Sequence, residues 1–472
     1  MKRILNRIII GSLTGSLLLA GCAKSFINKT PNDSLPIDLA LVDSNALQTA
    51  LNGAYAELRA VDAYGRSLLI MGDLQGDNMF VETDNAGRYL SDFNYSVVVN
   101  DGVALGIWQD LYAAIQRVNE IIDSKLTGTM VGQVKAQAYA LRALSYFKLV
   151  NIFAKPYTDD KTSLGVPLVL HYNLTYLPKR SSVDSVYMQI VSDLKTALLT
   201  APAYSTSTTL SQYSIEALLA RTYLYMGDNS NAETTAVDVI NNSGFTLVTP
   251  AQFGAFWADP GIHTDAVEVM FEVDSDIHNN NGSDDISIMF IPAGYEDLYA
   301  SGQLYNLYSS TDVRQSLLVP GQTKHGAAAY LINKYPNGAN TADRDNLKVI
   351  RLAEVYLIAA EAALPGDEAT ALSYLNALMA QRDPSFAGYS STGAQLLADI
   401  VQERRKELAF EGDRLGDLNR LKLAVYRGAA LNPGSIPGPL SIAYPDNRRV
   451  QPIPQSEVQA NSNIANQQNP GY

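Results

Sequence analysis

Apolar residues recur at three- and four-residue steps along three stretches of the chain: 46–58, 108–122 and 134–153. This spacing places the apolar side chains on one face of a helix, so an amphipathic helix is predicted in each stretch. Alternation of apolar and polar residues is limited to short, isolated runs at 95–99, 267–273 and 286–291, which are predicted to be strands. Helices must therefore form most of the core, and the predicted fold class is mainly α.

A short motif, Ala-x-x-Tyr followed by Leu or Phe, occurs in three places: Ala143–Phe147, Ala220–Leu224 and Ala353–Leu357. Gly227-Asp228 follows the second copy and Gly366-Asp367 follows the third, and each leads into another helical stretch. Small residues at helix crossings, a Tyr that fills the gap and a tight turn are typical of tetratricopeptide-like helix pairs that stack on one another. The copies begin 77 and then 133 residues apart (220 − 143 and 353 − 220), so large loop-rich inserts with short strands must interrupt the predicted pairs.

Changes in composition divide the chain into five segments: 1–21, 22–36, 37–243, 244–346 and 347–472. The third segment is predicted to be helical. The fourth is crowded with Gly, Asn, Asp, Ser and Tyr and loses helical periodicity, so it is predicted to be a loop-rich insert. The fifth returns to helices and ends in a proline-rich tail, which we expect to lie on the surface as a pinned coil because proline interrupts helices.

The N-terminal segment has the pattern of a signal peptide. Three basic residues precede an apolar run of 13 residues, 8–20, which is too short to span a bilayer. The run ends in Leu19-Ala-Gly-Cys22, which resembles the lipobox of bacterial lipoproteins, and Cys22 is the one cysteine of the chain. We therefore predict removal of residues 1–21, lipid attachment to Cys22 and a polar tether over 22–36. Two or more acyl chains hold a protein firmly on a membrane, so lipid is the predicted anchor.

The composition excludes several function classes. A chain that is 47% hydrophobic and 18% charged can bury a full core. The net charge of −13 has the wrong sign for a phosphate backbone, so nucleic acid is not a predicted partner. Four scattered His and one Cys offer no set of zinc ligands, and no metal site is predicted. Nucleophile-elbow, zinc-protease and phosphate-loop motifs are missing from the sequence, so neither an enzyme nor a cofactor is predicted.

Glu407 and Glu411 lie one turn apart on a predicted helix and could be the paired carboxylates of a glycosidase. A general acid needs a raised pKa, whereas the nearby Arg404 and Arg405 would favour the charged form and lower the pKa. We therefore interpret the cluster as a structural ion network that ties the helix ending near Gly412 to the next helix. Its predicted members are Glu403, Arg405, Glu407, Glu411, Arg414 and Arg420.

The acidic segment that starts at Asp274 begins like a calcium loop. Its sixth position is Asn279 and its twelfth is Asp285, where an EF-hand needs Gly and Glu, so an EF-hand is excluded. An irregular calcium site that uses Asp274, Asp276, Asp284 or Asp285 stays open as an alternative. A solvated acidic loop is the preferred interpretation.

Tyrosine is abundant, with 27 Tyr against 12 Phe. The flat ring and hydroxyl of Tyr suit the C–H faces and hydroxyl groups of sugars. Most of these rings are expected in the core, so the candidates for binding are aromatic residues in loop-like sequence, together with neighbouring amide and carboxylate groups. The predicted ligand-binding residues are Asp77, Asn78, Tyr89, Phe93, Tyr95, Trp257 and Tyr295.

Several motifs follow one another along nearly the whole chain: Leu51-Asn-Gly-Ala-Tyr55, Leu141-Arg-Ala-x-x-Tyr-Phe147, Arg351-Leu-Ala-Glu-x-Tyr-Leu357, Glu403-Arg-Arg-x-Glu-Leu-Ala-Phe-Glu-Gly412 and Gln468-Asn-Pro-Gly-Tyr472. With the lipobox at Cys22, they resemble the SusD/RagB-like outer-membrane lipoproteins of Bacteroidetes, which capture nutrients beside a TonB-dependent transporter. The resemblance implies about four tetratricopeptide-like helix pairs, a ligand surface built by loops, and one C-terminal SusD/RagB domain over 244–472.

The same resemblance implies a non-catalytic binding protein that is anchored to the outer membrane by lipid and faces the cell surface. Such a protein binds a nutrient, with an oligosaccharide as the leading expectation, and delivers it to a SusC-like TonB-dependent transporter. No acidic cluster follows Cys22, which leaves surface and periplasmic orientations open. Capture of a peptide and a tetratricopeptide-type envelope scaffold are the alternative functions. The identity of the ligand depends on loop geometry, which the sequence does not provide.

Overall fold

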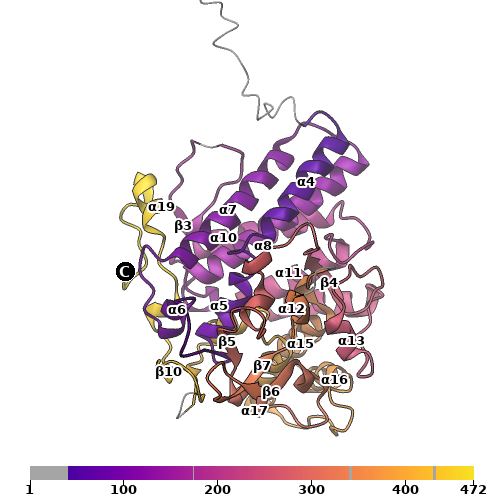
Figure 1. Cartoon of the computed structure of the whole chain (residues 1–472). Helices are drawn as coiled ribbons and strands as arrows, with labels where there is room; N and C mark the ends of the chain where they lie inside the picture. The colour runs from indigo at the N-terminus through magenta and orange to yellow at the C-terminus, as the bar shows by residue number, and fades with distance from the viewer. Residues whose placement is uncertain (1–40, 174, 340–342, 429–431) are drawn as a thin grey trace, which may run out of the picture.

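The structure is a computed structural model that describes residues 41–173, 175–339, 343–428 and 432–472. Helices dominate these residues (Figure 1). The helices are α4 (Ser44–Leu58), α5 (Ser67–Gln75), α6 (Leu90–Asn94), α7 (Gly102–Asp123), α8 (Thr129–Phe153), α9 (Tyr157–Asp160), α10 (Val183–Leu198), α11 (Gln212–Met226), α12 (Asn229–Asn242), α13 (Phe253–Ala258), α14 (Gly302–Tyr305), α15 (Leu352–Ala363), α16 (Glu368–Met379), α17 (Gly393–Glu407), α18 (Arg414–Arg420) and α19 (Gln455–Ala460). Within the described ranges, none of them combines the length and the apolar character that crossing a membrane requires.

Eight of these helices pack in succession, so that each contacts the next: α4, α7, α8, α10, α11, α12, α15 and α16. In the described part of the chain they form four consecutive pairs. This arrangement confirms the predicted mainly α fold of tetratricopeptide-like helix pairs. The three periodic stretches named above lie in α4, α7 and α8, as expected.

The repeated Ala-x-x-Tyr motif explains how the pairs pack. Its copies lie in α8, α11 and α15, and the first residue of each copy is fully buried: Ala143, Ala220 and Ala353. Small side chains at these positions let neighbouring helices approach closely, and Tyr146 and Tyr223 fill the space beside them. The turn from α11 to α12 uses Gly227, whose φ of +72° lies in the left-handed region that favours glycine at the end of a helix.

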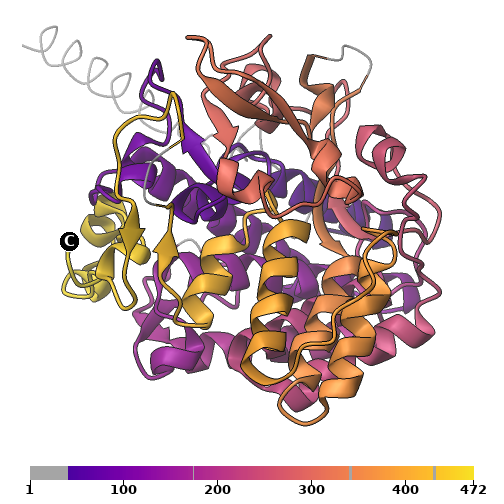
Figure 2. The same ribbon diagram turned by 90° about the horizontal axis from the view of Figure 1, so that it is seen from below.

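The strands are short and lie in the segments between the helices. They are β1 (Met79–Val81), β2 (Leu164–Pro167), β3 (Arg180–Ser182), β4 (Val269–Val273), β5 (Leu298–Ala300), β6 (Leu318–Gln322), β7 (Ala328–Ile332), β8 (Leu347–Arg351), β9 (Val425–Tyr426) and β10 (Ser441–Ile442). One antiparallel sheet has the order β1-β5-β7-β6, and the other strands form the pairs β4–β8, β2–β3 and β9–β10. Figure 2 shows the β6–β7 hairpin at the upper edge of the molecule, away from the helix pair α15–α16.

Only one of the three predicted strand runs is a strand, namely β4 at Val269–Val273. The run 95–99 is not a strand, because Tyr95 has a φ of +54° and its backbone N–H closes the end of α6. The run 286–291 begins with a 3-10 helix, Ile286–Met289, because the Asp285 side chain accepts from the backbone N–H of Ser287 at 3.1 Å and starts a turn. Local hydrogen bonds to the backbone thus overcome the alternating pattern at both places.

The C-terminal tail lies against the N-terminal helices, as the yellow segment at the side of Figure 1 shows. The Gln451 N–H donates to the Ile152 carbonyl at 2.9 Å, and Nδ2 of Asn469 donates to the Phe153 carbonyl at 2.8 Å. Arg180 donates through Nη1 to the Gln467 carbonyl at 2.6 Å. These hydrogen bonds hold the tail against the end of α8 and against β3, and the tail contains the short helix α19 as well as coil.

Candidate functional site

The structure buries the three aromatic rings that were predicted to bind ligand in the segment 89–95: Tyr89, Phe93 and Tyr95. The Tyr89 hydroxyl accepts from Nε of Arg66 at 2.9 Å, and burial raises the pKa of Tyr89 to about 12. The Arg427 guanidinium lies over the Phe93 ring, with its Cζ 4.2 Å from the ring centroid. These rings are closed to a ligand, which corrects the prediction for all three. Arg66 and Arg427, which are distant from this segment or from one another in the sequence, contact these rings, and the sequence does not reveal that packing.

Trp257, on α13, is also buried. Its ring centroid lies 4.4 Å from Nζ of Lys334, 5.0 Å from Nζ of Lys348 and 5.2 Å from Cζ of Arg351. A cation over an aromatic ring is attracted by the negative charge of the ring face, most strongly when both groups are away from water. Trp257 is therefore a core residue that covers three buried cations, and its prediction as a ligand-binding residue is corrected.

Asp77 and Asn78 contact the predicted ion network instead of a ligand surface. Asp77 accepts from Nε and Nη2 of Arg414 at 2.7 and 2.9 Å, and Asn78 Oδ1 accepts from Nε of Arg405 at 2.8 Å. Burial alone would raise the pKa of Asp77, but Arg405 and Arg414 together hold it below its ordinary value. The prediction of these two residues as ligand contacts is thus corrected as well.

Tyr295 is the one predicted ligand-binding residue that stays half-buried, and it lies in a group of polar side chains. The Arg88 guanidinium covers one face of its ring, with Cζ 3.5 Å from the centroid. Asp297 accepts from Nη1 of Arg88 at 2.9 Å and from Nζ of Lys324 at 3.0 Å. Nε2 of His325 lies 3.3 Å from a carboxylate oxygen of Asp84. We call these six residues the Asp297 cluster: Asp84, Arg88, Tyr295, Asp297, Lys324 and His325.

Strand pairing explains why the cluster forms. β1 and β5 are antiparallel with Val81 opposite Leu298, so the residues after β1 and those before β5 leave the sheet at the same end. The turn between β6 and β7 reaches this end, where the backbone N–H of Lys324 donates to the Tyr299 hydroxyl at 3.2 Å. Thr83 also donates through its backbone N–H to the Gly434 carbonyl at 3.0 Å. Four segments that are distant in the sequence therefore build one surface.

The Asp297 cluster combines groups that suit a hydroxyl-rich ligand. The side-chain exposed fraction is 70% for Asp84, 56% for His325 and 31% for Arg88, whereas Asp297 is 2% exposed. The buried carboxylate fixes two cations whose other N–H groups can donate, while Asp84 can accept and the Tyr295 ring provides an apolar edge. Glu296, which precedes Asp297, has a φ of +50°. This backbone conformation is uncommon for a residue other than glycine, and such residues are often found near binding sites.

Sequence reasoning missed most of this cluster, because only Tyr295 was predicted from it. The Lys324-His325-Gly326 turn between two short apolar runs was the one local signal, since it indicates a hairpin. Arg88 and Asp297 carry no local signal at all.

All six residues of the predicted ion network form ion pairs in the structure. The pairs are Glu403–Arg314 at 2.6 Å, Glu407–Arg351 at 2.8 Å, Glu411–Lys334 at 2.5 Å, Arg405–Asp77 at 3.3 Å, Arg414–Asp77 at 2.7 Å and Arg420–Asp417 at 2.8 Å. Glu407 is central, because it also pairs with Arg314 at 3.1 Å and with Arg382 at 2.9 Å. We call Glu407 with Arg314, Arg351 and Arg382 the Glu407 network.

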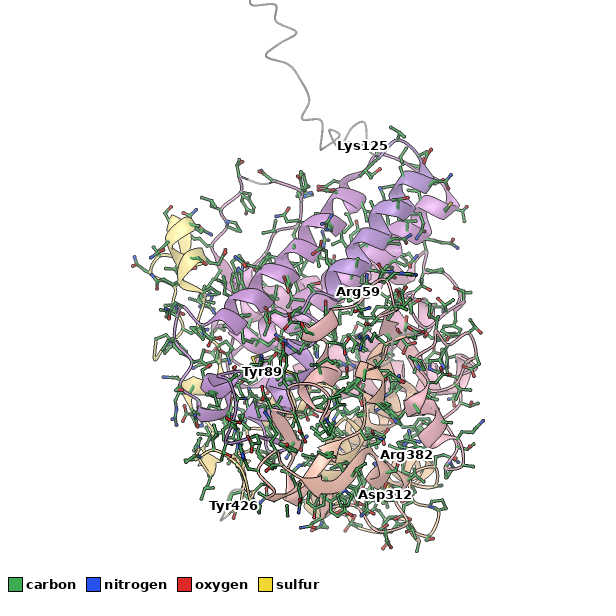
Figure 3. The ribbon with its side chains drawn as sticks, in the orientation of Figure 1. Arg59, Tyr89, Lys125, Asp312, Arg382 and Tyr426 are labelled. Carbon is green, nitrogen blue, oxygen red and sulfur yellow. The ribbon has the colours of Figure 1, made fainter. Side chains whose placement is uncertain are left out.

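The Glu407 network connects more of the molecule than the sequence indicated. Arg314 lies in a 3-10 helix (Val313–Leu317), Arg351 ends β8 and Arg382 follows α16, so the network joins α17 to the insert and to the pair α15–α16. Between α17 and α18, Arg404 pairs with Asp417, 3.2 Å apart, and the predicted members Arg405 and Arg414 meet at Asp77. Figure 3 shows Arg382 and Asp312 in the lower part of the molecule, apart from Tyr89.

The charges around Glu407 argue against acid catalysis. Burial alone would raise the pKa of Glu407, but the guanidinium groups of Arg382, Arg351 and Arg314 hold it well below its ordinary range. A general acid needs the opposite shift. The direction of the pKa shift agrees with the one expected from the sequence, although the arginines responsible are different ones.

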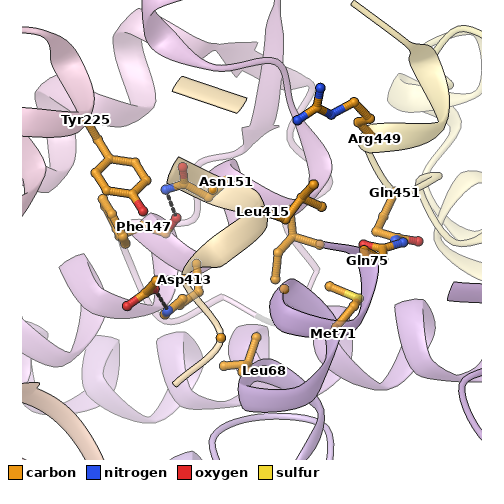
Figure 4. A pocket seen from close by; sticks show the side chains of 15 residues that line it. Leu68, Met71, Gln75, Phe147, Asn151, Tyr225, Asp413, Leu415, Arg449 and Gln451 are labelled. Atoms are coloured by element: carbon orange, nitrogen blue, oxygen red, sulfur yellow. Dashed lines mark hydrogen bonds and ion pairs between the residues drawn. The ribbon is translucent and has the colours of Figure 1, made fainter. Parts of the chain in front are cut away.

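A small cavity lies beside α5, α8, α11 and α18 (Figure 4). Its volume is about 40 Å³, and its apolar wall includes Leu68, Met71, Phe147, Tyr225 and Leu415. Figure 4 also shows the ion pair in its wall, where Nζ of Lys148 donates to Asp413 at 2.8 Å. A space of this size holds a few water molecules at most. It is therefore too small to be the ligand site.

The acidic loop that begins at Asp274 uses its carboxylates within the protein. Asp276 accepts from the backbone N–H groups of His278 and Asn279 at 2.6 and 2.7 Å, and Asp274 lies 3.7 Å from Nη1 of Arg59. Among the described residues, His, Cys, Asp and Glu side chains do not gather in any group of three or more that could hold a metal ion.

The predicted lipidation at Cys22, the signal peptide and the tether lie outside the described residues.

Comparisons with known proteins agree on one family. A family model described as starch-binding and associating with the outer membrane matches residues 25–224, and the SusD family model matches residues 313–472. SusD-like protein P2 of Formosa agariphila is 29% identical over 512 residues, which cover 97% of this chain and 98% of that protein.

Solved structures show the same relation. A structure from Bacteroides vulgatus is 30% identical, covers 91% of this chain and 98% of its own, and superposes with a TM-score of 0.82. A SusD superfamily protein from Bacteroides thetaiotaomicron is 28% identical, with 91% and 100% of the two chains covered and a TM-score of 0.81. These matches span both the helix pairs and the inserts, and they confirm the resemblance noted in the sequence. The chain therefore belongs to the SusD/RagB family.

Proposed function

We propose that the protein is a non-catalytic outer-membrane lipoprotein that binds an oligosaccharide and delivers it to a SusC-like TonB-dependent transporter. The observation that carries the proposal is the similarity over the whole chain to SusD-like proteins, together with a matching family model described as starch-binding and associating with the outer membrane. Lipid on Cys22 would hold the protein at the membrane without a spanning helix.

We place the ligand surface at the Asp297 cluster. Of the residues predicted to bind ligand, Tyr295 alone is not fully buried, and the cluster adds donors and acceptors that sugar hydroxyl groups need. Loops on a rigid scaffold commonly carry binding sites, and four segments meet here on the β1-β5-β7-β6 sheet. The cavity of Figure 4 is too small to compete with this placement.

Affinity electrophoresis through gels that contain different polysaccharides tests the binding function. We expect at least one polysaccharide to retard the wild-type protein, and we expect Arg88→Ala and Tyr295→Ala to reduce that retardation. Tyr176→Ala is the matched control, since Tyr176 is 53% exposed and lies outside the Asp297 cluster. A folded protein that no polysaccharide retards, but that binds peptides, would favour peptide capture. A folded protein that binds neither would favour the scaffold.

The membrane anchor is tested separately. Cys22→Ala removes the atom that would carry the lipid, so we expect the variant to leave the outer-membrane fraction. If it still sediments with outer membranes in high salt and carbonate, lipid on Cys22 is not the anchor.

A further inference from the structure

Helix α17 carries a second apolar face that the described residues of the fold do not bury. Ala394, the neighbours Leu397 and Ala398, and Val401 lie on successive turns of one side of the helix, and each is half-buried or exposed. On the opposite side, Leu396 and Ile400 are fully buried against α15 and α16, so the helix is already anchored to the core. A helix with apolar residues on both sides normally has both sides covered. The outer face of α17 therefore offers apolar surface that a partner molecule can cover.

This face forms one wall of a groove of about 390 Å³, a size that suits a small organic molecule. The other wall consists of Leu307, Leu421 and Leu423. Lys422, with a φ of +57°, turns the chain at the end of α18, and the Leu423 N–H donates to the Leu418 carbonyl at 2.8 Å. Leu423 is thereby held at the groove with 42% of its surface exposed. Figure 1 shows α17 at the bottom of the molecule, and Figure 2 is the view from below, with C-terminal helices in orange and yellow in the foreground.

The same groove is positively charged. Arg405 and Arg414 line it, and no carboxylate is among the described residues that do. Both guanidinium groups contact one carboxylate, that of Asp77, which leaves one positive charge without a counterpart. Their Nε and Nη2 atoms donate to Asp77 and Asn78, whereas the Nη1 atom of each has no hydrogen-bond partner among the described residues. This local charge contrasts with the net charge of −13 of the whole chain.

We propose that the α17 groove, defined by Leu307, Ala394, Leu397, Ala398, Val401, Arg405, Arg414, Leu421 and Leu423, binds a monocarboxylate with a hydrocarbon body. The aliphatic walls cover the body, and the two arginines hold the carboxylate through their remaining N–H groups. Gln402 is the one uncharged polar side chain among the described lining residues, so the groove does not suit a sugar. The proposal concerns a different surface from the Asp297 cluster and stands independently of the proposed function.

Isothermal titration calorimetry of the full mature chain tests the groove with decanoate as the probe, kept below the concentration at which it forms micelles. Decanol has the same hydrocarbon body without the charge, and glucuronate has a carboxylate without the hydrocarbon body. We expect decanoate to bind with one site per chain, decanol to bind about tenfold more weakly, as the loss of one charge-assisted hydrogen bond implies, and glucuronate not to bind.

Two variants locate the site. Ala398→Phe fills the groove, and Ala369→Phe places the same ring on the exposed side of α16 as a control. Leu423→Ser removes part of the other wall, and Leu177→Ser is its control because Leu177 is similarly exposed. Both groove variants should weaken decanoate binding about tenfold, and both controls should bind like the wild type. The proposal is overturned if decanoate does not bind, if decanol binds equally well, or if the groove variants bind like their controls.

Discussion

Pairs of cations and carboxylates occur in two contrasting regions of this molecule, the Glu407 network and the Asp297 cluster. In the first, Glu407 and its three arginine partners have side chains that are 2% exposed or less. In the second, one buried carboxylate holds Arg88 and Lys324, which are 31% and 27% exposed. The chemical groups and the distances between them are much the same in the two regions.

The two regions differ in whether water can replace an ion-pair partner that is lost. When one member of a fully buried network is removed, its partners stay charged in a medium that solvates them poorly, so the folded state loses several kcal/mol. At the surface, water takes over the lost interaction, and an ion pair contributes about 1 kcal/mol or less. The Glu407 network therefore has the properties of a framework, whereas the Asp297 cluster can exchange its water for a ligand without loss of the fold.

The largest effect is expected from Glu407→Gln. The amide keeps the shape of the side chain but leaves three buried guanidinium groups without their shared carboxylate, so the free energy of unfolding should fall by about 3 to 5 kcal/mol. Denaturant unfolding measures it. Glu57→Gln is the control, because Glu57 pairs with the exposed Arg117 and its loss should cost less than about 1 kcal/mol. Similar losses in the two variants would contradict the distinction between the two regions.

Trp257→Ala tests an uncharged side chain that packs against the buried cations beside the Glu407 network. The substitution leaves a cavity and uncovers Lys334, Lys348 and Arg351, so we expect a loss of about 3 to 5 kcal/mol in the free energy of unfolding. Thermal and denaturant unfolding measure this loss. If the variant kept its stability but bound ligand more weakly, Trp257 would be a ligand-binding residue and not a core residue.

Asp92 is an interior carboxylate without a guanidinium partner among the described residues, and it sharpens the comparison through pH. Burial, with repulsion from Asp101 as a smaller cause, raises the pKa of Asp92 from its ordinary value of 3.8 to about 8. The folded state then binds the proton more tightly than the unfolded state. The stability that this proton contributes is complete below about pH 4 and is lost as the pH rises through about 8.

Asp92→Asn keeps the side chain neutral at every pH. Its stability relative to the wild type should therefore increase from about pH 5 to about pH 8, as measured by urea unfolding at each pH. Asp265→Asn, which changes an exposed side chain, serves as the control and should follow the wild type. A stability difference that stays constant with pH would show that Asp92 is charged in the folded protein.

The smallest effect on stability is expected at the Asp297 cluster. Arg88→Ala and Tyr295→Ala should change the free energy of unfolding by about 1 kcal/mol or less, because both side chains are partly exposed and Lys324 still pairs with Asp297. Binding of a polysaccharide identified by affinity electrophoresis should nevertheless weaken severalfold, and titration calorimetry measures this change. Substitutions that unfold the protein would assign the cluster to the framework.

Much of the fold could be predicted because it depends on local patterns. The periodic stretches in α4, α7 and α8 and the Ala-x-x-Tyr copies mark the faces that helices present to one another. The short runs at 95–99 and 286–291 failed as strands because the hydrogen bonds that decide their structure come from neighbouring turns. The alternation of apolar and polar residues over five or six positions does not indicate whether those hydrogen bonds form.

The candidate site was less predictable. The six network residues lie close together in the sequence, and their alternating charges indicated ion pairs. The partners of Glu407, namely Arg314, Arg351 and Arg382, are 25 or more residues away from it, so local spacing could not identify them. The aromatic residues of 89–95 were predicted to bind ligand because their segment is loop-like, yet the structure buries them.

By itself, the sequence determined the helical fold class, the repeated helix pairs, the family and the charge state of the paired carboxylates. These properties follow from side-chain periodicity, motif order and neighbouring charges, all of which are written along the chain. Only the tertiary structure decided which aromatic rings stay accessible, which arginines meet Glu407, and that Arg88, Tyr295 and Lys324 gather around Asp297. Burial and ion pairing depend on segments that are distant in the sequence and meet only when the chain folds.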